Sequence, residues 1–293
     1  MTYRELITKA AMTLKEAQVP DYSLDAGLLF SECFNKDKGW LLAHDQEEIP
    51  SDGTGLHNIE KYEQFITRRA QRIPLQHILG SQMFMGLEFE VNEHVLIPRA
   101  DTEILVEEIL PHLHDGMQIL DMCTGSGCIL TSLLMYSNNC SGIGVDIMED
   151  ALEVARANSQ RILKDKVNIE YSYVNSNLFD NIPFTYHNKF DIIVSNPPYI
   201  RSDVIPGLEP EVRDFDPMVA LDGGQDGLDF YRKIISDGFV YLCPGGIMGL
   251  EIGHDQAEDV SSLFVESGYK DIEVFKDYAG LDRVVLARRG ITD

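Results

Sequence analysis

Four consecutive residues, Asn196-Pro197-Pro198-Tyr199, have the types and the spacing to bind a planar polar group. They follow Asp191–Ser195, a run with the character of a buried strand. Neither proline has an N–H group, so the strand must end there. The asparagine amide offers an acceptor and a donor, and the tyrosine offers a flat ring. A proline-terminated strand with an asparagine cap is the alternative interpretation.

A second polar segment follows the strand-like run Met117–Asp121 and reads Met-Cys-Thr-Gly-Ser-Gly. Gly125 and Gly127 permit a tight turn and the close approach of a ligand to the backbone. The helix that begins behind them offers free N–H groups. Asp146 ends the next strand-like run, about twenty residues further on, where a carboxylate can bind both hydroxyls of a ribose. The pattern indicates a nucleoside-containing ligand, with a purely structural turn as the alternative.

The residues that the glycine segment lacks narrow the choice of nucleoside. A dinucleotide-binding loop carries a third glycine, and Gly125–Leu130 does not contain it. The lysine of a Walker motif is absent as well. Asp121 would repel a phosphate but suits the cationic amino group of an amino acid. These points favour S-adenosylmethionine over NAD or ATP.

These polar segments need a frame, and hydrophobic periodicity predicts one. From about Gly116, strand-like runs alternate with helical runs, which is typical of a doubly wound α/β fold with a mostly parallel sheet. Ligands of such sheets bind beyond the carboxyl ends of the strands, where both polar segments lie. The seven predicted strands are residues 117–121, 141–147, 167–175, 190–195, 245–253, 272–277 and 283–289.

The first part of the chain has a helical pattern instead. Thr2 and Glu5 have capping-box spacing, and apolar residues recur with the helical period behind them. We expect a helical domain over residues 1–82 that recognises a partner, with a short turn at Trp40–Ala43. Alternating apolar residues predict a β-hairpin linker over 83–98, with Asn92-Glu93 between its strands. Residues 99–293 form the third segment, the catalytic domain.

Composition excludes some classes of function. The formal net charge of −24 argues against extended nucleic-acid binding, which needs many Lys and Arg contacts to phosphates. Arg68, Arg69 and Arg72 form the densest basic cluster in the first half, and we interpret it as a solvated helix face. No apolar run approaches the roughly 20 residues that span a bilayer, and no signal peptide is evident, so we expect a cytoplasmic protein.

Metal binding is not expected. The five cysteines form no CxxC pair and the eight histidines show neither HxxxH nor HExxH spacing, which argues against a zinc site. Scattered cysteines in a chain of this size are typical of reduced thiols in a core.

Several segments together resemble one protein family. The tetrapeptide at Asn196–Tyr199 resembles the (D/N/S)PP(Y/F/W) signature of methyltransferases that modify planar amino or amide nitrogens. Other segments resemble, in order, the HemK/PrmC family of peptide chain release factor N5-glutamine methyltransferases. They are RIPLQHILGSQMFMGLEF, HVLIPRADTEILVE, ILDMCTGSGCI, LEPEV, ALDGGQDGLDFYRKI, LEIGHDQ and AGLDRVV. The resemblance is looser over the helical N-terminus.

This resemblance implies a class I methyltransferase with a Rossmann-like fold, with S-adenosyl-L-methionine as methyl donor and S-adenosyl-L-homocysteine as product. Class I release factors would be the protein partners. Asn196, Pro197, Pro198 and Tyr199 would bind the substrate, and Asn196, Pro197 and Tyr199 would be catalytic. The implied cofactor-binding residues are Asp121, Cys123, Thr124, Gly125, Ser126, Gly127, Asp146, Asn177, Leu178 and Asn196.

The chemistry explains the choice of these residue types. A glutamine amide nitrogen is a poor nucleophile because its lone pair is delocalised, whereas a sulfonium activates the methyl group strongly. We therefore expect the Asn196 side-chain oxygen and the Pro197 carbonyl to accept both amide hydrogens, while Tyr199 packs against the amide. Orientation of this kind can contribute roughly 7–11 kcal/mol, so no strong general base is needed.

Two positions depart from the family pattern. Cys123 stands where many relatives have glycine, and we expect the small thiol to preserve the turn. Asn177 stands where many have aspartate, near the expected position of the adenine amino group, and its side-chain oxygen can still accept a hydrogen bond.

Other residues could support the site. Arg99 and Glu103 could line the cofactor cleft and support the active site. The alternative is a salt bridge between domains, with Asp101 or Thr102 as an N-cap. Glu211 could order the loop after Tyr199 or could be a surface acid. Glu251 ends a predicted strand, and we expect it to be structural.

Other functions stay open at this point. They are methylation of a ribosomal-protein glutamine, methylation of adenine N6 in a nucleic acid, and a non-catalytic adaptor with a nucleoside pocket. The acidity of the chain counts against the second, and the intact Asn-Pro-Pro-Tyr segment counts against the third.

The substitution Asn196→Ala should abolish methyl transfer, because it removes the acceptor that orients the amide. The fold and much of the cofactor affinity should remain. Turnover assays, circular dichroism and calorimetric titration with S-adenosylmethionine would check this. Near-normal turnover of the variant would contradict the assigned role.

Overall fold

The computed structural model describes residues 1–291, and its internal contacts divide the chain into two units. The first comprises Met1–Gly80 and Glu209–Phe215, and the second begins at Ser81 and contains the remainder. The predicted boundary at residue 82 is close to Gly80. The observed division differs from the predicted one in two ways. The hairpin packs with the second unit, and residues 209–215 belong to the first.

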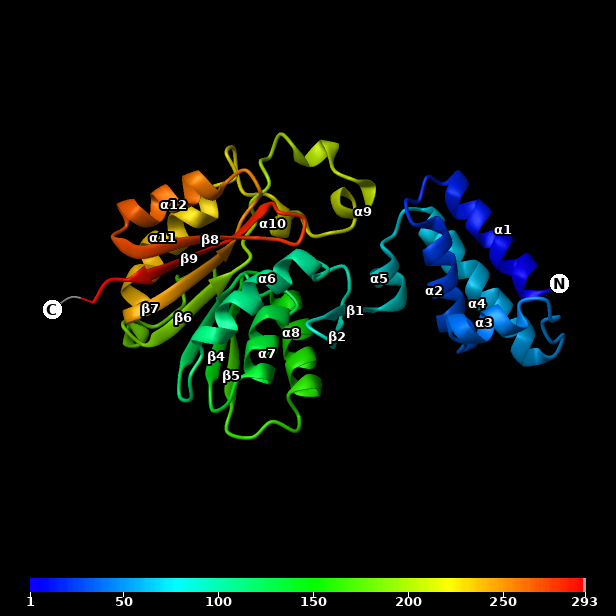
Figure 1. Cartoon of the computed structure of the whole chain (residues 1–293), viewed down its shortest axis with the longest axis horizontal. Helices are drawn as coiled ribbons and strands as arrows, with labels where there is room; N and C mark the ends of the chain where they lie inside the picture. Colours follow the sequence, from blue (N-terminus) through cyan, green and yellow to red (C-terminus); the bar gives the residue numbers. More distant parts are fainter. Residues whose placement is uncertain (292–293) are drawn as a thin grey trace. The chain divides into compact units, whose positions relative to one another are not determined.

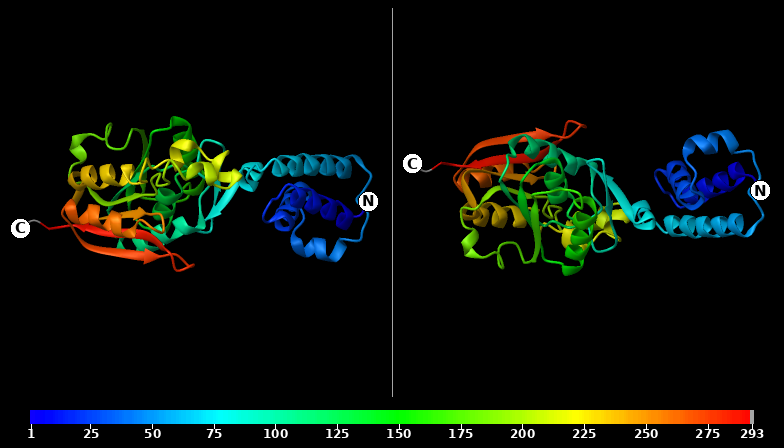
Figure 2. Two further views of the ribbon diagram at one scale, coloured as in Figure 1. Left: turned by 90° about the horizontal axis from the view of Figure 1, so that it is seen from above. Right: turned by 90° about the horizontal axis from the view of Figure 1, so that it is seen from below.

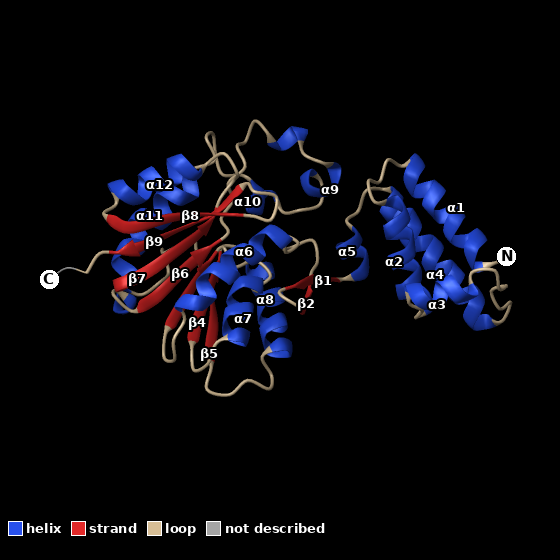
Figure 3. Ribbon diagram, viewed as in Figure 1, coloured by secondary structure: helices blue, strands red, loops and turns tan. Residues whose placement is uncertain are grey.

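The first unit consists of helices packed around a small apolar core (Figures 1 and 3). The capping box of Thr2 and Glu5 is confirmed at the first helix. Figure 2 shows α4 running beside α1 and α2. The helices are α1 (Tyr3–Glu16), α2 (Tyr22–Phe34), α3 (Lys38–His44), α4 (Gly53–Ala70), α5 (Leu75–Leu79) and α9 (Pro210–Arg213).

Two local predictions for this unit are wrong. Trp40–Ala43 is part of helix α3 rather than a turn, because the Asp37 side chain accepts a hydrogen bond from the Trp40 N–H at 2.6 Å and caps the helix. The basic cluster is not a solvated face either. The Arg69 side chain is only 6% exposed and pairs with Asp25 at 2.7 Å.

The partners of the two inner arginines include a distant segment of the chain. Arg69 Nη2 lies 2.9 Å from Glu211 Oε1, and Arg72 Nε lies 2.7 Å from the same oxygen. These pairs lower the pKa of Glu211, although its partial burial opposes the shift. Glu211 is therefore an anchor that holds residues 209–215 on the helical unit, and the prediction that it is only a surface acid is wrong.

The predicted hairpin exists, but its turn lies elsewhere. Strands β1 (Ser81–Phe84) and β2 (Leu87–Glu90) pair antiparallel around Met85 and Gly86. Both turn residues have positive φ, +50° and +70°, as a two-residue hairpin turn requires. Asn92-Glu93 therefore does not connect the two strands. Glycine at the second position makes this turn inexpensive.

The second unit contains the predicted seven-stranded sheet, in the order β5-β4-β3-β6-β7-β9-β8. The first five strands in this order are parallel, and β9 runs antiparallel to both of its neighbours. The doubly wound, mostly parallel fold is thus confirmed. The strands are β3 (Gln118–Met122), β4 (Ser141–Asp146), β5 (Glu170–Asn175), β6 (Phe190–Ser195), β7 (Leu242–Glu251), β8 (Tyr269–Lys276) and β9 (Asp282–Arg289).

Helices cover both faces of this sheet (Figures 1 and 3). Successive strand residues alternate between the faces, so Ile192 joins the apolar cluster under α6 and α7, and Ile193 joins the cluster under α11 and α12. The helices are α6 (Ala100–Ile109), α7 (Cys128–Tyr136), α8 (Glu149–Ile162), α10 (Met218–Leu221), α11 (Asp229–Tyr241) and α12 (Ala257–Glu266). Short 3₁₀ turns occupy Leu110–His112, Phe184–Tyr186 and Ile205–Gly207.

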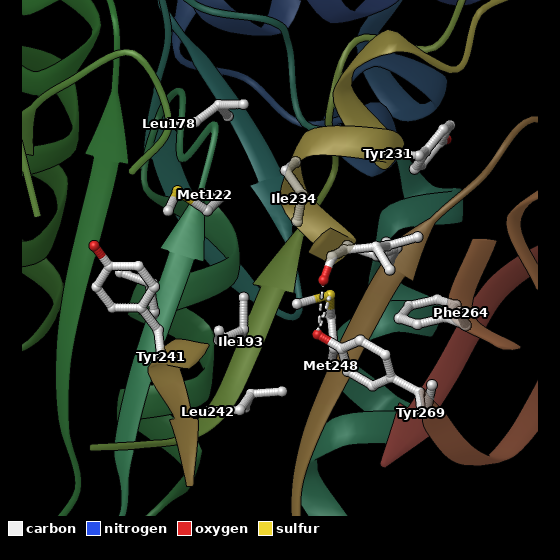
Figure 4. Packing of buried hydrophobic residues seen from close by; sticks show 14 of the residues in the cluster. Met122, Leu178, Ile193, Tyr231, Ile234, Tyr241, Leu242, Met248, Phe264 and Tyr269 are labelled. Atoms are coloured by element: carbon white, nitrogen blue, oxygen red, sulfur yellow. Dashed lines mark hydrogen bonds between the residues drawn. The ribbon is translucent and has the colours of Figure 1, made fainter. Parts of the chain in front are cut away.

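The cluster under α11 and α12 shows how tightly the sheet is covered (Figure 4). Tyr269 and Phe264 meet edge to face, with ring centroids 5.0 Å apart. The Tyr269 hydroxyl donates to the Ile235 carbonyl at 3.0 Å, so its polar end is satisfied inside the core. Within residues 1–291 no helix combines the length and the apolar character needed to cross a membrane.

The order of the strands decides where the polar segments meet. β3 lies between β4 and β6, and Met122 is in register with Val145 on one side and Ser195 on the other. Because these strands are parallel, the glycine segment, Asp146 and Asn196 all leave the sheet at one edge. This edge contains the point where the chain changes direction across the sheet, which is the usual ligand position in such folds.

The substitution Phe264→Ala should destabilise the second unit by about 3–5 kcal/mol, because this fully buried ring leaves a cavity under the sheet. Val265→Ala is the matched control. Its side chain is 64% exposed, so the change should stay within about 0.5 kcal/mol. Urea unfolding followed by circular dichroism would measure both. Equal shifts for the two variants would contradict this packing.

Candidate active site

The turn between β3 and α7 is built from residues in unusual backbone conformations. Cys123, Gly125 and Gly127 all have positive φ, at +57°, +54° and +77°. Glycine adopts such angles freely, whereas a residue with a side chain is strained by roughly 1–2 kcal/mol. The backbone at Cys123 is therefore one that glycine would adopt with less strain. The thiol keeps the turn at a conformational cost.

Asp146 organises this turn as well as facing the pocket. Its Oδ2 accepts a hydrogen bond from the Gly125 N–H at 2.9 Å, and its Oδ1 accepts from the Met148 N–H at 3.0 Å. Burial raises the pKa of Asp146, while these backbone donors oppose the shift. Each carboxylate oxygen retains a further lone pair, so Asp146 can still accept hydrogen bonds from ligand hydroxyls.

Asp121 lies beneath the turn and is fully buried. Its Oδ2 accepts hydrogen bonds from Thr124 Oγ1 at 2.6 Å and from the Leu130 N–H at 3.3 Å. Among residues 1–291, Oδ1 has no hydrogen-bond partner. Burial raises the pKa of this carboxyl to about 7 against the effect of both donors. A buried acid with a spare oxygen is a candidate for binding a cationic group.

A pocket opens at this edge of the sheet. Six of the ten predicted cofactor residues line it: Cys123, Gly125, Asp146, Asn177, Leu178 and Asn196. The other four, Asp121, Thr124, Ser126 and Gly127, are not in its lining, and all four are buried. Of the predicted substrate residues, Asn196 and Pro198 face the pocket, whereas Pro197 and Tyr199 do not line it.

Sequence reasoning missed much of the pocket wall. His94, Val95 and Leu96 come from the segment after β2. Pro217 precedes α10, Val219 and Ala220 lie in α10, and Phe230 lies in α11. Val95, Ala220 and Phe230 lie in segments that resemble the family, but none of them was predicted as a pocket residue. Folding brings these segments to this edge. Leu178, which was predicted, has a φ of +50°, a strained conformation of the kind that gathers at functional sites.

The donor set suits a nucleoside with an amino-acid tail. Asp146 is placed for ribose hydroxyls, Asn177 offers an amide for a base edge, and Val95, Leu178 and Phe230 provide apolar walls. A Cβ added to Gly127 would lie 3.0 Å from the Ala155 Cβ, so glycine is required where α7 packs against α8. These residues fit S-adenosylmethionine, and no lysine stands in the pocket lining for a phosphate.

The end of β6 is fastened by several contacts. Asn196 Nδ2 donates to Thr102 Oγ1 at 3.1 Å, which leaves Oδ1 of the same amide as an acceptor. The Tyr199 hydroxyl donates to Glu251 Oε1 at 3.4 Å. Gly223 packs so closely on this segment that an added Cβ would lie 2.7 Å from the Tyr199 Cα. These contacts hold the Asn-Pro-Pro-Tyr segment in place, and they leave the Asn196 side-chain oxygen free to accept a hydrogen bond.

The predicted supporting residues hold loops rather than line the pocket. Arg99 Nη2 lies 2.6 Å from Asp216 Oδ2, whose side chain is fully buried, and both residues belong to the second unit. The pair fastens the segment that brings Pro217 to the pocket. Glu103 accepts a hydrogen bond from the Met85 N–H at 2.5 Å and so holds the hairpin turn. A salt bridge between domains is wrong for both.

No group of three or more His, Cys, Asp or Glu side chains within residues 1–291 could hold a metal ion. The five cysteines are all unpaired thiols, and burial raises the pKa of Cys128 to about 12. Neither the turn nor the pocket offers a metal-ligand set among these residues.

Comparison with known proteins agrees with this architecture. Residues 5–80 match the PrmC N-terminal domain family, and residues 113–220 match a methyltransferase domain family. The release factor glutamine methyltransferase of Clostridium acetobutylicum is 41% identical over 99% of both chains. That of Agrobacterium fabrum is 40% identical over 97% of this chain and 96% of its own.

The chain belongs to the release factor glutamine methyltransferase family. It is thus an enzyme of the methyltransferase class, as the resemblance implied. A methyltransferase from Pyrococcus furiosus shares the fold at 20% identity, with a TM-score of 0.53 over 77% of this chain and 99% of that one.

The pair Gly125→Ala and Gly127→Ala should separate backbone strain from packing. Both positions have positive φ, so each alanine should cost roughly 1–2 kcal/mol. Only at Gly127 would the methyl group press on Ala155 and Tyr173, each 3.0 Å away, which should cost about 1–3 kcal/mol more. Thermal unfolding would measure the difference. Equal losses would contradict the close approach of α7 to α8.

Proposed function

We propose that this enzyme transfers the methyl group of S-adenosylmethionine to the side-chain N5 of the glutamine in the Gly-Gly-Gln motif of class I release factors. One observation carries the proposal: Asn196 gives its Nδ2 to Thr102, so its Oδ1 is the acceptor at the pocket. An acceptor at this position suits the N–H of a planar amide or amino group. Family membership supports a release factor glutamine as that group.

The residues of the segment then act mainly by orientation. Asn196 Oδ1 and the Pro197 carbonyl accept the two amide hydrogens and direct the nitrogen lone pair toward the methyl donor. They also stabilise the positive charge that develops on nitrogen. When bound, S-adenosylmethionine supplies a methyl group on a sulfonium and leaves as S-adenosylhomocysteine. The methyl group replaces one amide hydrogen, which passes to water as a proton.

The rest of the pocket would hold the methyl donor. Asp146 would accept hydrogen bonds from the ribose hydroxyls, and Asn177 would face the adenine amino group with its side-chain oxygen. Asp121 does not line the pocket, so its carboxylate would favour the cationic amino group of the donor through its charge, from beneath the turn. The helical unit, which matches the PrmC N-terminal domain, would bind the release factor.

Two other substrates present a similar hydrogen-bonding edge. A ribosomal-protein glutamine has the same amide, and adenine has an exocyclic amino group with two N–H donors. The net charge of −24 disfavours an extended nucleic-acid complex. Methylation of a ribosomal-protein glutamine would need no basic surface on the enzyme, so this is the stronger of the two alternatives.

The enzyme should transfer label from methyl-labelled S-adenosylmethionine to a purified class I release factor. We expect mass spectrometry to place one methyl group on the glutamine of its Gly-Gly-Gln motif. Purified ribosomal proteins and DNA should remain unlabelled in parallel reactions. The matched control is a release factor with glutamate at that position, which has no amide nitrogen to accept the methyl group. Label on DNA, or on the glutamate variant, would refute the proposal.

A further inference from the structure

The last residue of β7, Glu251, is a buried acid that the reaction described above does not use. It is 1% exposed and stands next to the end of β6, where Leu250 is in register with Ser195. The Tyr199 hydroxyl donates to its Oε1, and Oε2 has no partner at hydrogen-bonding geometry within residues 1–291. Burial of a carboxylate destabilises the folded state unless hydrogen bonds or ion pairs compensate for the lost hydration.

The Thr102 hydroxyl connects this carboxylate to Asn196. Thr102 lies in the first turn of α6 and is 2% exposed. Its Oγ1 accepts from Asn196 Nδ2 at 3.1 Å, and its side chain also interacts with Glu251, which lowers the pKa of that carboxyl. A hydroxyl has a single hydrogen. When Oγ1 accepts from Asn196, that hydrogen is available to the carboxylate.

The direction of these bonds decides which end of the Asn196 amide faces the substrate. An ionised carboxylate can only accept, so in its interaction with Glu251 the Thr102 hydroxyl would be the donor, while it accepts from Asn196 Nδ2. A protonated Glu251 could donate to Thr102 instead. The Thr102 hydrogen would then be free to point at Asn196 and to favour the flipped amide, which presents N–H groups to the substrate N–H groups.

We propose, on the basis of the function proposed above, that Glu251 is a positioning residue for methyl transfer. Its carboxylate fixes the orientation of the Asn196 amide through the Thr102 hydroxyl, so that Oδ1 accepts from the substrate amide. The same carboxylate holds the Tyr199 hydroxyl. Tyr199, the last residue of the Asn-Pro-Pro-Tyr segment, contacts this carboxylate directly. Asn196, the first residue, contacts Thr102, whose side chain interacts with the same carboxylate.

The groups around Glu251 predict the pH at which its carboxylate loses or regains its effect on the Asn196 amide. Burial raises its pKa to about 7, while Thr102, the Arg283 guanidinium of β9 and Tyr199 lower it and Asp101 of α6 raises it. Arg283 is itself shared with Asp277 and Asp101, and Tyr231 of α11 donates to the Glu251 backbone carbonyl. The orienting carboxylate therefore forms as the pH rises through 7.

The side-chain amide resonance of Asn196 tests this without any methyl acceptor. The NMR signal of this side-chain amide can be assigned because it disappears in Asn196→Asp. In a pH titration of the wild-type enzyme, its chemical shift should change with a midpoint near pH 7. The midpoint should persist in Thr102→Ser, which keeps the hydroxyl, and should vanish in Thr102→Val and Glu251→Gln. Glu258→Gln is the matched control, since this acid is exposed on α12 and should change nothing. A midpoint that survives in Glu251→Gln would overturn the proposal.

Turnover gives the second readout. Glu251→Gln should lower kcat by about 100-fold, the effect of a misplaced reacting group, with donor affinity nearly unchanged. Adding Thr102→Val should lower it little further, because both changes break one chain of contacts. Full kcat in Glu251→Gln would also overturn the proposal. If the wild-type enzyme itself fails to label release factors, the proposed function fails, and the resonance experiment still decides the role of Glu251.

Stability separates this role from a structural one. The raised pKa means that the folded state holds a proton that the unfolded state releases, so stability falls as the pH rises toward 7 and the loss persists above it. Glu251→Gln removes this loss. The variant should be at least as stable as the wild-type enzyme at pH 8 in thermal unfolding, although it turns over slowly. A variant that loses activity because it unfolds would contradict the positioning role.

Discussion

The parallel pairing of β4, β3 and β6 is the constraint on which the site depends. Each strand contributes a different group where it ends, namely Asp146, the glycine turn and Asn196. Parallel strands in register deliver these groups to one edge, and short loops keep them there. The two polar segments therefore leave neighbouring strands of the sheet.

Buried acids distinguish this edge from the rest of the core. Asp121 and Glu251 lie at the ends of β3 and β7, and burial raises the pKa of each to about 7. Each has an oxygen without a partner among residues 1–291. A core selected for stability alone would replace such groups with apolar ones. Their presence indicates that the edge is arranged for recognition and orientation, with stability supplied by the apolar layers on both faces of the sheet.

The chain also links the site to the helical unit in an indirect way. Residues 209–215 lie between the Asn-Pro-Pro-Tyr segment and Pro217 in sequence, yet Arg69 and Arg72 hold them on the helical unit through Glu211. The chain therefore passes from the second unit to the first and back again within the loop that follows the Asn-Pro-Pro-Tyr segment. Arg69 and Arg72, two of the three arginines of the basic cluster predicted to be solvated, thus bind residues 209–215.

The sequence by itself determined the order and type of the main elements, because hydrophobic period and glycine position are local properties. It also indicated Gly125, Asp146 and Asn196, since polar residues directly after buried strands are visible in one dimension. Only the tertiary structure decided the rest. Thr102 contacts Asn196 across 94 residues of sequence, and Tyr199 reaches Glu251 across 52. The direction of a hydrogen bond depends on which groups folding brings together, so no local pattern in the sequence could show which atom of the Asn196 amide is left free at the pocket.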